Sequence, residues 1–331
     1  MTRKWLAAIA AAGAFALAAC SSGGAPDPGS SSGGDEAELG HLRVIQSVNK
    51  DYSAGGVDWA ILENAWPEGL TVETVQGTSV AQALATGDAD LTVGSVTRIM
   101  PPVLQDGLPV TLVGPTLDKW EQFFVVSTDW PSADSLADLK GARFGVTTFG
   151  SAGDLTVQAV AQAQGWTEGT DYTRQTLSDI GGLTAALQAG TIDAFAWGGP
   201  VPFQLQADGV ANLLFGVGDE LTWLPGGVIA VRNDVLQSRP AAVKAFCETY
   251  YAMNDLVLDD PDKAVAQFAE WQNISVDLAA EGYEYEKGLI ATDSEMTDEQ
   301  FDAIALGMKI QQEIDTDGAT LRQYYVDCST L

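Results

Sequence analysis

Two segments far apart in the chain share one pattern of small, polar and apolar residues: GTSVAQALATGDADLTVGSV at 77–96 and GGLTAALQAGTIDAFAWGGP at 181–200. In each, a helical stretch ends at a glycine, and an aspartate leads into a short apolar strand followed by another small-residue turn. Backbone N–H groups at such turns and helix starts favour anions and polar oxygens, and small residues let a ligand approach the backbone closely. The repeat therefore predicts two similar α/β units whose loops border one ligand crevice, although each copy is also compatible with an ordinary helix-to-strand connection.

Motifs for catalysis or metal binding are missing from the sequence. The chain contains no HExxH metal motif and no GxxxxGK[ST] phosphate loop, and its only histidine, His41, lies at the edge of a Gly/Ser-rich segment. Closely spaced carboxylates in EYEKG (284–288) and DSEMTDEQ (293–300) are typical of solvated surfaces. We therefore expect a protein that is not an enzyme and that holds no metal and no cofactor.

The N-terminal residues resemble a bacterial lipoprotein signal peptide. A basic MTRK start precedes the apolar stretch WLAAIAAAGAFA, and LAAC ends at Cys20. The resemblance implies a signal peptide at 1–19 and a lipid on Cys20, with an ordinary secretory signal as the alternative. Residues 20–40 are rich in Gly, Ser, Pro and acidic side chains and predict a flexible tether. We therefore expect an extracytoplasmic protein anchored to the cell membrane by an N-terminal lipid, with no further membrane span.

Net charge limits the binding partners that the chain could have, and the cysteine content predicts a disulfide. The full sequence carries a formal net charge of -29, which would repel nucleic acid and anionic lipid head groups and most simply serves solubility. Once Cys20 carries lipid, Cys247 and Cys328 remain as an even pair outside the cytoplasm, so we expect a disulfide, with two buried thiols as the alternative. The bridge would close a loop of about 80 residues and pin the C-terminal tail.

From Leu42 onward, short apolar runs alternate with helical segments, which is typical of an α/β fold with largely parallel strands. Strands are expected at 42–47, 70–76, 89–95, 109–115, 122–127, 142–148, 172–178, 192–198, 211–217 and 226–232. Helices are expected at 56–66, 79–87, 97–107, 135–141, 152–165, 182–190 and 200–209. After Arg232 the pattern predicts helices only, beginning with 233–259 and 261–273.

Four motifs in a characteristic order give the chain a family resemblance: ALATGDADLTVGS, GLPVTLVG, SLADLKGARFGVTTFGSAGD and GGLTAALQAGTIDAFAWGGP. From about residue 42 to 310 the chain resembles solute-binding proteins of ABC importers, in the nitrate, sulfonate and taurine (SsuA/THI5-like) branch that includes binders of thiamine-pyrimidine precursors. The resemblance implies a type II periplasmic-binding clamp with lobe I at 41–117, lobe II at 118–222, and a return strand and C-terminal helices of lobe I at 223–331. It also implies a monomer with a small-molecule solute and an ABC permease as partners.

The resemblance places the ligand contacts on loops that follow the strands. The corresponding residues are Ser47, Asn49 and Tyr52 in SVNKDYSAGG, Thr78 and Ser79 in GTS, Ser95 and Thr97 in GSVT with Arg98 after it, Thr148, Phe149, Gly150, Ser151 and Ala152 in TTFGSAGD, and Trp197 in WGGP. The TTFGSAGD segment opens a helix whose N–H groups would face an acidic or polar moiety. For any single residue, an ordinary turn, N-cap or core role is the alternative.

Basic and aromatic residues near these loops bear on the ligand class. A sulfonate or nitrate would gain from one cation, and the candidates are Lys50, Arg98, Lys119 and Arg143, of which Arg98 is favoured. Aromatic side chains suit an organic body instead, and those near loops are Tyr52, Trp59, Trp120, Phe149, Trp197 and Trp223. We therefore expect a small organic solute, sulfonate- or taurine-like, with a thiamine-pyrimidine precursor or other planar solute as the alternative and an enzyme on the same fold as a weaker one.

Overall fold

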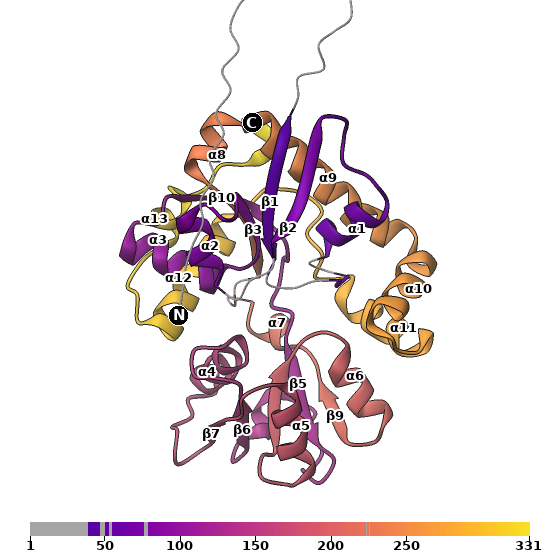
Figure 1. The fold of residues 1–331 in the computed structure, drawn as a ribbon. Helices are drawn as coiled ribbons and strands as arrows, with labels where there is room; N and C mark the ends of the chain where they lie inside the picture. The colour runs from indigo at the N-terminus through magenta and orange to yellow at the C-terminus, as the bar shows by residue number, and fades with distance from the viewer. Residues whose placement is uncertain (1–38, 47–49, 53–54, 76–78, 223, 225) are drawn as a thin grey trace, which may run out of the picture. The chain divides into compact units, whose positions relative to one another are not determined.

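The computed structural model describes residues 39–331, apart from 47–49, 53–54, 76–78, 223 and 225 (Figure 1). The expected signal peptide, the lipidation site Cys20 and nearly all of the expected tether lie outside the described residues. The chain from Ala37 to Leu331 forms one compact unit. In the part of it that is described, no helix is both long enough and apolar enough to cross a bilayer.

The first sheet has the strand order β2-β1-β3-β10-β4. Its strands are β1 (Gly40–Gln46), β2 (Leu70–Val75), β3 (Leu91–Ser95), β4 (Val110–Pro115) and β10 (Gly227–Arg232). Strand β1 pairs in parallel with β2 and β3, whereas β10 runs antiparallel to both β3 and β4. A strand from the far end of the α/β region therefore completes the sheet that the chain begins.

The second sheet repeats this arrangement with the order β7-β6-β8-β5-β9. Its strands are β5 (Phe123–Ser127), β6 (Arg143–Val146), β7 (Thr173–Thr176), β8 (Ala194–Trp197) and β9 (Ala211–Leu214). Strand β6 is parallel to β7 and β8, and β5 is antiparallel to β8 and β9. All ten predicted strands are present, and the expected two-lobed α/β fold is confirmed. The exact lobe boundaries at 117 and 222 stay predictions.

Both faces of each sheet are buried, because apolar side chains alternate between two cores along the central strands. In β10, Val228 and Ala230 pack into one core cluster while Ile229 and Val231 pack into another. In β5, Phe124 faces one cluster and Val125 the other. A strand that is buried on both faces consists of consecutive apolar residues, and such runs can be recognised in the sequence.

Helices cover the sheets on both sides (Figure 1). They are α1 (Gly56–Leu62), α2 (Val80–Thr86), α3 (Val96–Asp106), α4 (Ala152–Gln164), α5 (Ile180–Gln188), α6 (Pro200–Ala207), α7 (Val217–Glu220), α8 (Asn233–Ser238), α9 (Pro240–Asp259), α10 (Pro261–Gln272), α11 (Val276–Glu286), α12 (Asp298–Gln312) and α13 (Gly318–Arg322), with short 3₁₀ turns η1 (Leu136–Leu139) and η2 (Cys328–Thr330). Two of the helix predictions differ from the structure. The helix expected at 135–141 is only the short 3₁₀ turn η1. The helix expected at 233–259 is divided before Pro240, which lacks an N–H and begins α9.

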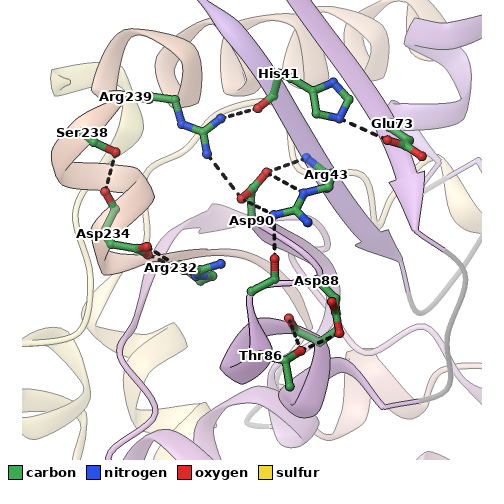
Figure 2. Close-up of polar contacts among 12 residues, drawn as sticks. His41, Arg43, Glu73, Thr86, Asp88, Asp90, Arg232, Asp234, Ser238 and Arg239 are labelled. Atoms are coloured by element: carbon green, nitrogen blue, oxygen red, sulfur yellow. Dashed lines mark hydrogen bonds and ion pairs between the residues drawn. The ribbon is translucent and has the colours of Figure 1, made fainter. Parts of the chain in front are cut away.

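The repeated sequence builds the same ion pair in both sheets. Asp90 precedes β3 and accepts from the backbone N–H of Arg43 at 2.9 Å and from its guanidinium at 3.1 Å (Figure 2). Asp193 precedes β8 and accepts from the N–H of Arg143 at 2.8 Å and from its guanidinium at 2.6 Å. Burial opposes ionisation of Asp90, but hydrogen bonds from Arg43 and the charges of Arg43 and Arg239 outweigh it and lower the pKa of this carboxyl. Both pairs lie at the amino-terminal edge of their sheet.

The C-terminal tail is joined to α9 by a disulfide between Cys247 and Cys328, as the cysteine count predicted. The two cysteines are 81 positions apart in sequence and their Cα atoms are 6.5 Å apart. Both side chains are buried, and the Lys244 ammonium donates to the Ser329 carbonyl at 2.6 Å beside them. The tail is therefore part of the core around the first sheet.

Candidate functional site

The carboxyl-terminal edge of the first sheet holds part of the predicted site. Ser95 ends β3, and its hydroxyl lies 2.8 Å from that of the buried Thr97 at the start of α3. Arg98 follows as an exposed residue, and no described residue forms an ion pair with it. Ser79 is the exposed N-cap of α2, without a side-chain capping bond. The predicted contacts Ser47, Asn49 and Thr78 lie outside the described residues.

In the second sheet, the predicted loop after β6 caps its own helix. The Gly150 N–H, expected to face a ligand, donates to the Asp154 carboxylate at 2.9 Å, and the Ser151 hydroxyl accepts from the Asp154 N–H at 3.3 Å. Ala152 is the first residue of α4 and is partly buried. Thr148 and Phe149 remain exposed, with 61% of Phe149 accessible. The exposed side chains of Thr148 and Phe149 are therefore better placed to contact a ligand than the Gly150 N–H, which already donates to Asp154.

A cation that the sequence analysis missed supports this loop. Arg174 in β7 pairs with Asp154 at 2.6 Å and with Glu168 at 2.7 Å, and its guanidinium carbon lies 5.2 Å from the centre of the Phe149 ring. Hydrogen bonding to Glu168 and Asp154 outweighs burial and raises the pKa of Arg174. Asp154 is 1% exposed, so Arg174 compensates a fully buried charge.

Three of the predicted aromatic residues belong to the core instead of a ligand surface. Tyr52 is fully buried: its ring stacks on Phe268 at 3.9 Å between centroids, and its hydroxyl donates to the Ala279 carbonyl at 2.9 Å. Trp59 is buried and packs against Trp271. Trp120 is buried and donates from Nε1 to the Thr156 hydroxyl at 2.8 Å. Trp223 lies outside the described residues.

Trp197 ends β8 opposite Phe123 of β5 and is only partly buried. Gly198 and Gly199 follow it, and Gly199 has the left-handed φ of +74° as the N-cap of α6. A Cβ atom on Gly198 would stand 3.4 Å from Cγ of Glu121, and one on Gly199 would stand 4.0 Å from Oδ2 of Asp51. Two acidic residues, one following β1 and one preceding β5, thus lie next to the same glycine turn.

Glu121 is the perturbed titratable group of this region. Its side chain is partly buried, and burial together with the negative charge of Asp51 raises the pKa of its carboxyl to about 7. No described cation forms an ion pair with it. Sequence reasoning missed both Asp51 and Glu121, because neither stands in a motif and their convergence follows only from the fold.

Three cavities bordered by described residues lie elsewhere, beside the C-terminal helices and the two crossings, where the chain passes between the sheets from β4 to β5 and from β9 to β10. They measure about 460, 640 and 470 Å³ and are bordered, respectively, by Leu117 and Glu299, by Phe215 and Tyr285, and by Trp166 and Lys309, among others. None of these three is bordered by Ser95, Phe149 or Trp197. Within the described residues, no group of three or more His, Cys, Asp or Glu side chains is arranged to hold a metal ion.

The fold is similar to that of several solved binding proteins. The alkanesulfonate-binding protein SsuA of Xanthomonas axonopodis pv. citri, bound to MOPS, has 18% identity and a TM-score of 0.68, covering 88% of this chain and 99% of that one. The aliphatic sulphonate-binding protein SsuA of Escherichia coli has 17% identity and a TM-score of 0.67, covering 86% and 91%. The nitrate-binding protein NrtA of Synechocystis PCC 6803 has 13% identity and a TM-score of 0.63, covering 87% and 86%.

A search of curated protein sequences gives no match. The family described as NMT1/THI5 like, in contrast, matches residues 67–264, which is more than half of the chain and spans the second sheet together with most of the first. The chain therefore belongs to the NMT1/THI5-like family and has the two-lobed α/β fold of periplasmic binding proteins.

Proposed function

We propose that this protein is the lipid-anchored, extracytoplasmic substrate-binding protein of an ABC importer and captures a small organic solute between its two lobes. The observation that carries the proposal is the duplicated edge: Ser95 ends β3 and Trp197 ends β8, which have the same place in their sheets, and Phe149 lies just after the neighbouring strand β6. The family match and the alkanesulfonate- and nitrate-binding roles of the fold neighbours support a binding role over catalysis.

The two chain crossings would supply the hinge of such a clamp. Lys119 and Asp219, one in each crossing, pair at 2.7 Å. A Cβ atom on Gly226 would stand 2.1 Å from the Leu117 carbonyl oxygen, so only glycine lets the crossings approach this closely. Two short connections between the lobes would allow them to rotate, and a ligand that contacts both lobes would favour the closed form by those additional contacts.

The proposed ligand contacts are those of the loops at the sheet edges. Side chains of Ser79, Ser95 and Arg98 serve the first lobe, and Thr148, Phe149 and Trp197 serve the second, with Ser47, Asn49 and Thr78 as further contacts. The Arg98 guanidinium would pair with the sulfonate of a taurine-like solute, because Arg98 is exposed and forms no ion pair with a described residue. The rings of Phe149 and Trp197 favour a planar solute, such as a thiamine-pyrimidine precursor, as the second candidate.

A thermal-shift panel tests the binding role. Taurine, short alkanesulfonates, nitrate, thiamine and its pyrimidine precursor are added separately, and binding at a hundred times Kd should add about 2.7 kcal/mol to the stability of the folded state. Trp197→Ala should remove the shift without unfolding the protein. Trp130→Ala is the matched control, because Trp130 is not among the proposed contacts and its Nε1 donates to the carbonyl of Asp138 in η1. An equal shift in wild type and Trp197→Ala would contradict the proposed site.

A further inference from the structure

The cavity of about 640 Å³ beside α11 is bordered by three aromatic rings. They belong to Phe203 in α6, Phe215 after β9 and Tyr285 in α11, and we call these three side chains the aromatic wall. The centre of the Phe215 ring lies 6.0 Å from that of Phe203 and 5.0 Å from that of Tyr285, so the rings pack against one another. Phe215 is nevertheless 39% exposed, which leaves apolar ring surface available at the cavity.

The aromatic wall is anchored in the core of the protein. Phe203 is buried and belongs to one core cluster with Leu278 of α11. A Cβ atom on Gly282 would stand 3.6 Å from the Phe203 ring, so α6 and α11 are in direct contact. The Tyr285 hydroxyl donates to the backbone carbonyl of Glu121 at 3.0 Å. These contacts hold the wall in place without a ligand.

The rim of the cavity is acidic and comes from one face of α11. Asp277, Glu281 and Glu284 border the cavity at intervals of four and three residues, which places these exposed side chains on the same side of the helix. Glu284 pairs with Lys287 at 2.6 Å, whereas no described residue forms an ion pair with Asp277 or Glu281. The described residues that border the cavity include no lysine, arginine or histidine. Like charges at this spacing repel each other, so a cation beside them is favoured.

Negative charge also surrounds the aromatic wall itself. Burial raises the pKa of the Tyr285 hydroxyl, and neighbouring negative charges, that of Glu121 foremost, raise it further. The helix dipole accounts for an acidic side chain at Asp277, in the first turn of α11, but not for one at Glu281 farther along. A cation is attracted both by the carboxylates and by the faces of aromatic rings, whereas a neutral apolar molecule gains from the rings alone. The cavity volume lies within the range of small-molecule sites, about 300 to 1,000 Å³.

We propose that the cavity between α6 and α11 is a second binding site, which takes an organic cation with an apolar body, such as an aromatic quaternary ammonium ion. The apolar body lies on the aromatic wall, and the ammonium group lies toward Asp277 and Glu281. This site does not depend on the solute site proposed above, because none of the described contacts named for that site borders the cavity.

Two probes of the same shape test the role of charge. They are the 4-(hydroxymethyl)phenyltrimethylammonium ion and 4-tert-butylbenzyl alcohol, in which a carbon replaces the charged nitrogen. Calorimetric titration of the purified protein should show the ammonium probe binding about tenfold tighter, because an exposed ion pair and a cation–π contact each contribute about two- to fivefold. Raising the NaCl concentration from about 0.02 M to about 0.5 M should weaken its binding, because salt screens the exposed carboxylates.

Single substitutions then locate the bound ammonium probe. Glu281→Gln should weaken its binding about two- to fivefold, whereas Glu248→Gln, which removes an exposed carboxylate on α9, should leave it unchanged. Phe215→Leu keeps an apolar side chain without a ring and should also weaken binding about two- to fivefold. Trp197→Ala, a change at the proposed solute site, should retain binding of the ammonium probe.

The outcomes separate this inference from the binding role proposed above. Equal binding of the two probes, no binding of the ammonium probe, or full affinity in both Glu281→Gln and Phe215→Leu would overturn the inference. Loss of ammonium binding in Trp197→Ala would place the cation at the edges of the sheets and would overturn it as well. In each of these cases the solute panel still decides the binding role on its own.

Discussion

Replacing Glu121 by Gln should stabilise the protein at neutral and alkaline pH and leave its stability unchanged in acid. Burial and the Asp51 charge raise the pKa of Glu121 to about 7, compared with an ordinary value of 4.5. Each pKa unit between the folded and unfolded states is worth about 1.4 kcal/mol, so ionised Glu121 costs the folded state about 3 kcal/mol. Glutamine keeps the shape of the protonated acid and carries no charge, and it therefore removes this cost.

The sign of the pH dependence follows from which state ionises first. Below about pH 4 the carboxyl is protonated in both states and contributes no difference. Between about pH 4.5 and pH 7 the unfolded chain ionises before the folded one, so the contribution of Glu121 to the free energy of unfolding falls as pH rises. Above about pH 7 the cost is fully present and constant. The benefit of Glu121→Gln should therefore grow across this window and then level off.

Urea unfolding of wild type and Glu121→Gln at about pH 4, 6 and 8 measures this difference directly. Glu220→Gln, which removes an exposed carboxylate on α7, is the control for the loss of one acidic side chain. A gain below about 1 kcal/mol at pH 8, or a gain of the same size at every pH, would refute the reasoning.

Three further changes test other parts of the structure. Arg174→Ala leaves Asp154 buried without its cation and should lower the free energy of unfolding by about 3 to 5 kcal/mol in urea, whereas Arg174→Lys should recover part of the loss; equal stability of the Ala variant and wild type would contradict the buried pair. Replacing Cys247 and Cys328 by Ser should cost about 4 to 5 kcal/mol from loop entropy, and the loss should match that seen on reduction of the wild type. Cys20→Ser should abolish labelling by a radioactive fatty acid in the native host, and persistent labelling would rule out this anchor.

The sequence predicted the framework better than the site, for physical reasons. Strands buried on both faces, such as β10, are continuous apolar runs that need no tertiary information to recognise. The helix division at Pro240 was predictable in principle from the missing N–H, whereas the location of Tyr52 was not, because a tyrosine at a loop is equally compatible with a ligand and with Phe268. Glu121 and Asp51 belong to segments that only the fold brings together, and no local pattern marks the raised pKa of Glu121.

The twin pairs Arg43–Asp90 and Arg143–Asp193 have a consequence for how each sheet is assembled. Each joins two parallel neighbours, β1 with β3 and β6 with β8, through a main-chain and a guanidinium contact together. A slip of one residue between such neighbours would turn every side chain of one strand to the opposite face and break both contacts at once. In each lobe, one ion pair therefore favours the native register of these two strands. The spacing of its loops at the opposite edge is therefore set during folding, before any solute arrives, and the loops can vary in sequence without disturbing that alignment.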